Sequence, residues 1–429
     1  MNNMLDMNLI RNNQDMVVAG LKKREYSVDF SDFNAWDEKR KSIIQEVEAL
    51  KAERNKVSKE IPALKKAGED VAPIIEKMSS LKDEIASLDE SLRDVDEKIK
   101  DFVVSLPNLP ADDVTPGGKE NNAVIHTWGE KPAHDFEAKN HVELAESLGI
   151  IDYERGAKLA GNGFWIYKDK GALLEWALLN YFISAHLKDG YTFMLPPHIL
   201  SYESGYTAGQ FPKFEDDVFK LEQEKGYMQF LLPTAETALI NYHRNETLTE
   251  DELPKKYFAY TPCYRKEAGS YRAEERGMIR GHQFNKVEMF QYTTPEQSDA
   301  ALEELIKKAE ALVQGLGLHY QLSKLAAGDC SASMRKTYDI EVWIESMQVY
   351  KEVSSASNAG DYQARRGNMK YRMASEKKAA FMHTLNASGL ATSRILPALL
   401  EQHQQADGSV LIPEALRPFT GFDKIEPIK

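Results

Sequence analysis

Hydrophobic residues recur every three or four positions along two adjoining stretches near the beginning of the chain. The first stretch has one seam at Trp36, Ile43, Leu50, Val57 and Leu64 and a second at Arg40, Val47, Arg54 and Ile61. The second stretch has its seam at Ile74, Met78, Leu81, Ile85, Leu88, Leu92, Val95, Ile99 and Phe102. A mean spacing of about 3.5 residues is typical of a coiled coil. The pattern therefore predicts two long helices, at about 34–66 and 71–104.

The segment between these helices contains the signals for a reversal of the chain. Gly68 suits the end of the first helix, and Pro73 suits the start of the second. Because the connection is short, we expect the helices to pack against each other as an antiparallel arm, each about 45 Å long. Pro62 predicts a kink or an unwound turn near the tip of the arm. Pro107 and Pro110 end the second helix and stiffen the linker that follows.

After residue 112 the pattern changes to short, aromatic-rich segments, helical patterns and glycine-bearing turns. Strand-like segments occur at 191–195, 227–233, 256–262, 287–293, 338–344 and 349–355. This succession predicts an antiparallel β-sheet with helices packed against it, rather than a doubly wound parallel sheet. The predicted fold class is therefore α+β, with a domain at 1–110 that contains the arm and a sheet-based domain at 111–429.

The charge balance limits the partners that the chain can have. Its 429 residues include 54 Lys and Arg against 67 Asp and Glu, a net charge of −13. A nucleic-acid binder normally has a basic surface, so an RNA partner would have to meet a local basic patch. The distal half of the first helix offers basic residues at Lys51, Arg54, Lys56, Lys59, Lys65 and Lys66. The alternative is a coiled coil that joins two chains, although its seam can be satisfied within one chain.

The two cysteines, Cys263 and Cys330, fit a reducing cytoplasm and provide no disulfide framework. These isolated cysteines and the scattered histidines do not have the ligand spacing of a zinc site. No apolar run approaches the roughly 18 residues of a membrane helix. The first residues lack the basic start and apolar core of a signal peptide. We therefore expect a cytoplasmic protein that has no zinc and no membrane partner.

Charged residues are concentrated between two β-prone ends in the segment 261–292. They are Arg265, Lys266, Glu267, Arg272, Arg276, Arg280, His282 and Glu288. An arginine with a glutamate two residues on, a basic loop and a closing strand suit a two-stranded ribbon that grips a planar, anionic ligand. The alternative for Arg265 and Glu267 is a cross-strand ion pair on the surface. The common phosphate-loop, metalloprotease and hydrolase motifs are absent from the sequence.

The ordered motifs of the second domain resemble those of class II aminoacyl-tRNA synthetases, specifically the bacterial seryl-tRNA synthetases. The segment GYTFMLPPHIL resembles motif 1, LLPTAETALI the serine-binding loop, and 261–292 motif 2. The strand pair before motif 3 is matched by TYDIEVWIESMQVYKEVSSASNAGDYQARR, and motif 3 by LNASGLATSRILPALLE. Motif 1 then covers about 172–200 and motif 3 about 384–402. Together with the arm, the resemblance covers essentially the whole chain.

The resemblance implies a class II catalytic domain and a homodimer formed through the motif 1 region. It implies a ligase that activates L-serine with ATP to seryl-adenylate and transfers serine to the 3′-terminal adenosine of serine tRNA. Selenocysteine tRNA would be a further substrate where it is present. The arm would bind the body of the tRNA by its shape.

The resemblance also implies a set of site residues. The ATP-binding set is Arg265, Lys266, Glu267, Phe284, Glu352, Val353, Ser354, Ser355 and Arg394, with Arg276 or Arg280 at the distal phosphates. The serine-binding set is Thr234, Ala235, Glu236, Arg265, Glu288 and Ser388. Within these sets, Arg265, Glu352 and Arg394 are catalytic, and Glu352 and Ser355 hold Mg²⁺ through ATP. The alternatives are edge-strand polar residues for Glu352 and Ser355, a solvated or interface arginine for Arg394, and pairing of Glu288 with Lys286.

These residue types suit the implied reaction. The attacking carboxylate of serine is already ionised, so positioning and charge stabilisation are needed rather than a general base. Serine is small, so a pocket must recognise its polar groups, and a buried carboxylate that awaits a hydroxyl disfavours alanine. Other hypotheses are a ligase that loads a carrier protein, a second copy that resists a serine-mimicking antibiotic, and an inactive RNA-binding scaffold.

Overall fold

The computed structural model describes residues 5–222, 226, 228–267, 277–374 and 378–428, and the chain divides into two compact units. Of the described residues, the first unit holds those up to Val18 together with Ser27–Pro107. The second holds Ala19–Tyr26 and the chain from Asn108 onward. Within the described residues, no helix has the length and apolar character needed to cross a membrane.

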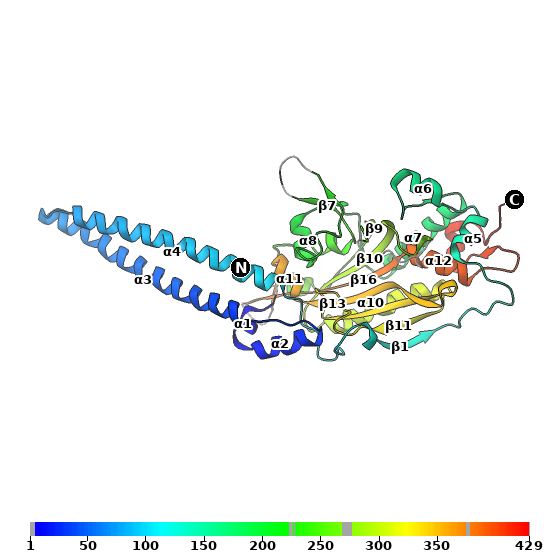
Figure 1. Ribbon diagram of the computed structural model, residues 1–429, viewed down its shortest axis with the longest axis horizontal. Helices are drawn as coiled ribbons and strands as arrows, with labels where there is room; N and C mark the ends of the chain where they lie inside the picture. Colours follow the sequence, from blue (N-terminus) through cyan, green and yellow to red (C-terminus); the bar gives the residue numbers. More distant parts are fainter. Residues whose placement is uncertain (1–4, 223–225, 227, 268–276, 375–377, 429) are drawn as a thin grey trace. The chain divides into compact units, whose positions relative to one another are not determined.

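Two long helices, α3 (Ser31–Ala67) and α4 (Ala72–Ser105), run side by side as the arm of the first unit (Figure 1). The predicted seams face each other, since Ile43, Val47 and Val57 on α3 and Leu81, Ile85, Val95 and Ile99 on α4 are buried. Gly68 ends α3 in the left-handed conformation at φ 76°, which a residue without a Cβ adopts easily. Helix α3 runs through Pro62 to Ala67, so the unwound turn predicted there is not formed.

Polar contacts fix the register of the arm. Arg40 on α3 pairs with Asp96 on α4 at 2.7 Å, and Phe30, Phe33 and Phe102 form an aromatic cluster at the base of the two helices. Two short helices, α1 (Met7–Asn12) and α2 (Gln14–Lys23), precede the arm. The six basic residues predicted to meet RNA are exposed, apart from the half-buried Arg54. The distal half of α3 thus presents basic side chains, interleaved with acidic ones, while the apolar seam of the arm is satisfied within one chain.

The second unit is built on an eight-stranded sheet with the order β1-β11-β12-β13-β16-β10-β9-β4. Its strands are β1 (Ala123–Trp128), β4 (Thr192–Met194), β9 (Lys255–Tyr264), β10 (Gln283–Thr293), β11 (Tyr320–Lys324), β12 (Lys336–Ile344), β13 (Val349–Gly360) and β16 (His383–Ala391). All neighbours are antiparallel except β4 and β9, which are parallel. The predicted antiparallel sheet is therefore confirmed, with one parallel edge strand.

Small sheets surround the large one. They are formed by β5 (Ile199–Ser201), β6 (Lys220–Leu221) and β7 (Gln229–Leu231); by β8 (Thr247–Thr249), β14 (Lys370–Arg372) and β15 (Ala379–Phe381); by β2 (Ile151–Asp152) and β3 (Ile166–Tyr167); and by β17 (Val410–Leu411) and β18 (Lys424–Ile425). The predicted strand at 227–233 belongs to the first of these as β7. Its expected place in the large sheet is wrong, because β7 pairs with β5 and β6.

Helices pack against the large sheet (Figure 1). The helices of this unit are α5 (His141–Ser147), α6 (Tyr153–Ala160), α7 (Lys170–Lys188), α8 (Tyr202–Ala208), α9 (Glu236–Leu239), α10 (Ser298–Gly315), α11 (Tyr362–Gly367), α12 (Thr392–Gln402) and α13 (Arg417–Thr420). Helix α10 packs on β13 and β16, while α12 packs on β10, β12 and β13. The core beneath them includes Val287, Met289, Ile340, Leu385 and Ala387. Because side chains alternate along a strand, the residues between these apolar positions point to the opposite face.

Candidate active site

The opposite face of the four central strands carries polar residues that meet across the strand pairings. Glu288 on β10 lies opposite Ser388 on β16. Asp339 on β12 lies opposite Ser355 on β13, and two residues further along β12 Glu341 lies opposite Glu352. These residues line a cavity of about 670 Å³. Its other lining residues include Lys119, Asn122, Thr234, Glu236, Arg265, Arg280, Lys286, Asp329, Ser331, Glu341, Lys351, Glu352, Asn386 and Arg394.

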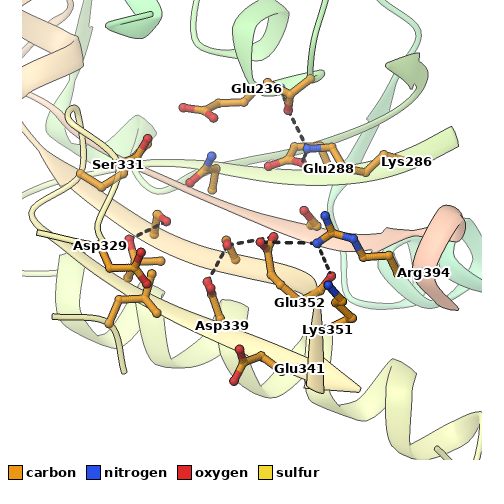
Figure 2. A pocket seen from close by; sticks show the side chains of 18 of the residues that line it. Glu236, Lys286, Glu288, Asp329, Ser331, Asp339, Glu341, Lys351, Glu352 and Arg394 are labelled. Atoms are coloured by element: carbon orange, nitrogen blue, oxygen red, sulfur yellow. Dashed lines mark hydrogen bonds and ion pairs between the residues drawn. The ribbon is translucent and has the colours of Figure 1, made fainter. Parts of the chain in front are cut away.

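At one end of the cavity, two carboxylates surround a buried lysine (Figure 2). The Lys286 ammonium group forms an ion pair with Glu288 and donates a hydrogen bond to Thr234 Oγ1 at 2.7 Å. Glu236 follows Thr234 at the start of α9, and its Oε1 accepts from Gln363 Nε2 at 2.8 Å. Burial and the neighbouring Glu288 carboxylate raise the pKa of Glu236 to about 7. We call these five residues with Ser388 the carboxylate end of the cavity.

At the other end, arginine and oxygen donors lie closer to solvent (Figure 2). Arg394, in the first turn of α12, donates from Nη1 to the Glu352 carbonyl oxygen at 2.8 Å and from Nε to the Ile279 carbonyl oxygen at 3.2 Å. Its guanidinium also lies 3.7 Å from the Glu352 carboxylate. Ser355 Oγ donates to Asp339 Oδ1 at 2.5 Å. Burial and the nearby Glu352 charge hold the pKa of Asp339 well above its usual range.

A smaller cavity of about 70 Å³ adjoins this open end. It is lined in part by Arg265, Glu267, Arg280 and Phe284. The Arg265 guanidinium lies 5.3 Å from the centroid of the Phe284 ring, a distance suited to a cation–π contact. Arg280 pairs with Glu267 at 2.6 Å. A flat ligand group entering here would therefore meet an aromatic ring and a carboxylate already held by an arginine.

The structure corrects the expected local geometry of Arg265 and Glu267. Strand β9 ends at Tyr264, so neither residue lies on a strand, and Glu267 has a φ of +50°. Both side chains still line the smaller cavity because the chain turns toward it after β9. The alternative of an Arg265–Glu267 surface pair is not formed, since Glu267 pairs with Arg280. The alternative pairing of Glu288 with Lys286 is formed, and it occurs inside the main cavity.

Most of the predicted site residues line one of the two cavities. Those in the main cavity are Thr234, Glu236, Arg265, Glu288, Glu352, Ser355, Ser388 and Arg394. Those in the smaller cavity include Glu267, Phe284 and Val353. The predicted residues that line neither cavity are Ala235, Lys266 and Ser354. Arg272 and Arg276 lie outside the described residues.

The predicted residues outside the cavities have other contacts. Ala235 packs in an apolar cluster with Leu239 and Tyr257. Lys266 donates its backbone N–H to the Asp217 carbonyl oxygen at 3.1 Å. Ser354 Oγ donates to the Ser388 carbonyl oxygen at 2.6 Å, which ties β13 to β16 beneath the cavity. These contacts place all three beside the site.

Sequence reasoning missed several lining residues. It named Lys286 only as a competing partner for Glu288, and it did not name Asp339, Glu341 or Asn386. Their signal is the alternation of polar and apolar residues in β12 and β16, where every second residue enters the core. That signal identifies a polar face, but it does not show which strands lie side by side.

The open end offers the donors that a divalent cation prefers. Glu352 and Ser355 provide a carboxylate and a hydroxyl, and Ser355 Oγ lies 3.2 Å from Glu352 Oε1. One carboxylate and one hydroxyl suit a Mg²⁺ ion whose coordination shell is completed by phosphate oxygens and water. Across the described ranges, no group of three or more His, Cys, Asp or Glu side chains is arranged to hold a metal ion. The residues therefore fit a cation that arrives with a phosphorylated ligand.

Comparisons with known proteins extend over both units. The family model for the seryl-tRNA synthetase N-terminal domain matches residues 4–110. The model for the class II tRNA synthetase core domain (G, H, P, S and T) matches residues 219–403. Serine--tRNA ligase 2 of Clostridium acetobutylicum is 62% identical over 432 residues, covering 98% of this chain and 100% of that protein. Serine--tRNA ligase of Oleidesulfovibrio alaskensis is 46% identical over 420 residues, covering 97% of each.

A solved structure is similar over the same extent. The crystal structure of seryl-tRNA synthetase from Pyrococcus horikoshii complexed with ATP has a TM-score of 0.92 and 33% sequence identity. The match covers 99% of this chain and 100% of that one. Both the sequence and the backbone are therefore similar along nearly the whole length.

Proposed function

Because the chain belongs to the serine--tRNA ligases, or seryl-tRNA synthetases, we propose that the main cavity binds ATP and L-serine and joins them as seryl-adenylate. Serine then passes to the 3′-terminal adenosine of serine tRNA, and of selenocysteine tRNA where that is present. One observation carries the proposal. A single cavity brings together a buried carboxylate (Glu288) and a half-buried one (Glu236) at one end and arginines with oxygen donors at the other.

The open end is assigned to ATP. We assign to Arg265 the role of bridging the α-phosphate and the serine carboxylate bidentately, and its place in the lining of both cavities supports this role. Adenine would stack on Phe284 and present its amino group to Glu267 in the smaller cavity. Arg394 would neutralise the terminal phosphate, much as an arginine finger does. Arg280 also lines both cavities and pairs with Glu267; of the loop arginines that the structure describes, it is the one assigned to the distal phosphates.

Mg²⁺ is assigned to Glu352 and Ser355, which lie at the edge of the same end. When bound with ATP, the ion would neutralise charge on the phosphates and on the departing pyrophosphate. Asp339 accepts from Ser355 Oγ at 2.5 Å and so orients that hydroxyl. The backbone carbonyl of Glu352 holds Arg394 at 2.8 Å. The chain thereby fixes its own donors before ATP arrives.

The carboxylate end is assigned to serine. Glu236 and Glu288 offer negative charge to the substrate ammonium group and an acceptor to its hydroxyl. Ser388 lies opposite Glu288 across the strand pair and completes the polar wall. A substrate without the hydroxyl would leave a buried carboxylate without a partner, which disfavours alanine. The geometry therefore supports selection by polar contacts rather than by size alone.

The arm is assigned to the body of the tRNA. Its distal basic residues project from α3 while the apolar seam is buried against α4. A rigid pair of helices can follow the phosphate backbone and recognise the shape of the RNA. We expect that removal of residues 34–103 abolishes charging of serine tRNA and preserves serine-dependent pyrophosphate exchange. Unchanged tRNA charging by the truncated protein would contradict this role.

We also propose a homodimer formed through the motif 1 region. Helix α7 buries Leu174 and Leu178 in the core but exposes 54% of Trp176. Leu195, just after β4, is 73% exposed. Such apolar groups on adjoining elements are typical of an interface.

The buried free thiols of Cys263 and Cys330 support a reducing compartment, and we propose the cytoplasm.

Serine-dependent exchange of pyrophosphate into ATP tests the function. The wild-type protein should catalyse exchange with L-serine and Mg²⁺, and exchange with L-alanine should be far slower. Charging of purified serine tRNA tests the second step, with a carrier protein as the competing acceptor. An absence of serine-dependent exchange from folded, dimeric wild-type protein would refute the proposal.

A further inference from the structure

The carboxylate end contains a cation that the proposed chemistry does not use. Lys286, on β10, keeps only 7% of its side chain exposed and lines both cavities. A buried ammonium group is strongly unfavourable unless it is paired and hydrogen-bonded. Lys286 satisfies this condition with two groups, the Glu288 carboxylate and the Thr234 hydroxyl. Both partners belong to the wall assigned to serine.

The contact with Thr234 fixes the direction of its hydroxyl. Thr234 Oγ1 accepts from Lys286 Nζ at 2.7 Å and from the backbone N–H of Glu236 at 3.2 Å. A hydroxyl group has two acceptor sites and one donor. Since both acceptor sites are occupied, the hydroxyl proton must be donated elsewhere. Thr234 can therefore meet an oxygen of serine, and it cannot accept from the substrate ammonium group.

The contact with Glu288 fixes the charge of the wall. Glu236, at the start of α9, faces Glu288 and Lys286 from β10, Arg265 from the end of β9 and Gln363 from α11. The Glu288 carboxylate raises the pKa of Glu236, and the buried Lys286 ammonium group lowers it. Without Lys286, the pKa of Glu236 would therefore rise further, and the wall would lose negative charge at a higher pH.

We propose that Lys286 is a positioning residue for serine recognition, which holds the Glu288 carboxylate in place by an ion pair and makes Thr234 a donor toward a serine oxygen. This inference rests on the assignment of the carboxylate end to serine. It predicts that the acceptor for the substrate ammonium group is a carboxylate, while the threonine hydroxyl recognises the carboxylate or hydroxyl oxygen of the substrate. Lys286 itself keeps its contacts with Glu288 and Thr234 and does not bind serine directly.

The main test replaces the charge while keeping the length of the side chain. Lys286→Met should raise the KM for serine about 100-fold, because the buried Glu288 loses its counter-ion. The KM for ATP should change by less than about threefold, because the polar partners of Lys286 are Glu288 and Thr234, which are assigned to serine, although its side chain also borders the smaller cavity. The matched control is Lys256→Met on the neighbouring strand β9, where the lysine pairs with Glu304 at 2.6 Å away from the cavity. That control should stay within about twofold of wild type for both substrates.

A pH profile separates a positioning role from a purely structural one. In Lys286→Met, the loss of serine affinity on acidification should begin at higher pH than in wild type. The reason is that Glu236 and Glu288 would then share the wall with Arg265 as the remaining cation. A profile that coincides with wild type would contradict the proposal.

Double variants identify the groups through which Lys286 acts. If the lysine acts through Glu288, Lys286→Met should add less than about threefold to the serine KM in a Glu288→Gln background. An added effect of 30-fold or more there would overturn the inference. At the hydroxyl, Thr234→Ser should keep serine binding near wild type, while Thr234→Val should weaken it about tenfold. Equal behaviour of these two variants would overturn the donor role.

The outcomes distinguish this inference from the proposed function. If wild-type protein shows no serine-dependent exchange, the proposed function fails. If wild type is active and Lys286→Met keeps a wild-type KM for serine, only the role of Lys286 fails. Thermal unfolding of each variant checks its fold. If Lys286→Met does not fold, the double variant Lys286→Met/Glu288→Gln is used instead, because it removes the Glu288 carboxylate that would lack its partner. The serine KM of this double variant is then compared with that of Glu288→Gln alone.

Discussion

The two ends of the main cavity hold their charges in opposite ways. At the carboxylate end, the side chains of Lys286 and Glu288 are 7% and 2% exposed and form an ion pair with each other. At the open end, Arg394 and Glu352 are 25% and 44% exposed and lie 3.7 Å apart. Charges removed from water interact strongly and are screened weakly, whereas exposed charges are screened by salt. The buried end is thus suited to selecting a small substrate, and the open end to receiving a large, highly charged one.

The difference also explains which residues are fixed before the substrates bind. Gln363 and Lys286 hold Glu236 and Thr234 at the buried end. At the open end, the Glu352 carbonyl and Asp339 hold one arginine and one hydroxyl, while the Glu352 carboxylate remains close to solvent. A fixed wall favours discrimination between similar small molecules. A partly fixed wall allows phosphates and their cation to complete the site.

The largest expected effect comes from Arg265, which lines both cavities and joins the two ends. Arg265→Ala should reduce serine-dependent pyrophosphate exchange by at least about 10³-fold, because it removes stabilisation at the α-phosphate. Arg265→Lys should restore little, since an ammonium group cannot bind two oxygens in the same plane. Exchange assays should be paired with light scattering, which should show an unchanged dimer. Near-normal exchange by Arg265→Ala would refute the bridging role.

A smaller effect, confined to the open end, is expected from Arg394. Arg394→Ala should lower kcat/KM for ATP about 100-fold and leave the KM for serine within about threefold of wild type. The control is Arg155→Ala on α6, where an exposed arginine pairs with Asp152 at 2.9 Å. That variant should behave as wild type in the exchange assay. An equal loss for both substrates would show that the two ends are not independent.

Sequence patterns predicted the arm and the sheet because their signals are local. The heptad seam, Gly68 and the alternation within strands each depend on neighbours in the chain. The family prediction is confirmed by relatives that match nearly the whole length. The pairing of strands that are far apart in the sequence was harder to predict, which is why the segment of β7 was expected in the large sheet. The pairing of Asp339 with Ser355 likewise depends on the register of β12 and β13.

Within the site, residue types were easier to predict than side-chain directions. Thr234, Glu236 and Glu288 line the cavity, whereas Ala235, predicted with them, packs in an apolar cluster. Glu267 was expected on a strand, whereas the chain leaves β9 at Tyr264. A motif specifies which residues are present. The direction of each side chain depends on where the strand ends and on what packs behind it.

A pH dependence should distinguish the buried end from the open one. Because the pKa of Glu236 is about 7, its carboxylate gains a proton as the pH falls below that value. The KM for serine should therefore rise about tenfold for each pH unit between about 6.5 and 5.5, while the KM for ATP changes less. Exchange kinetics across this range would measure both constants. The same pH dependence in Glu236→Gln as in wild type would contradict the assignment.

The same group should affect stability with a defined sign. The folded pKa of Glu236 lies above the ordinary value of about 4.3, so the unfolded chain loses this proton first as the pH rises. Stability is therefore lost between about pH 4 and 7 and is constant above that range. Glu236→Gln should then be more stable than wild type at pH 8, by about 1–3 kcal/mol. Urea unfolding at pH 5 and pH 8 would measure the difference, which should be smaller at pH 5.

The smallest expected effect is a difference in salt dependence between the two ends. Raising the salt concentration from about 0.05 to 0.5 M shortens the screening length from about 14 to 4 Å. The KM for ATP should rise a few-fold, because Arg394 and Glu352 face solvent. The KM for serine should change by less than about twofold, because Lys286 and Glu288 lie beneath the surface. Kinetics at constant free Mg²⁺ would separate screening from competition for the cation. Equal salt dependence of the two KM values would mean that solvent reaches both ends of the cavity alike when the substrates are bound. That result would contradict the assignment of serine selection to the buried carboxylate end.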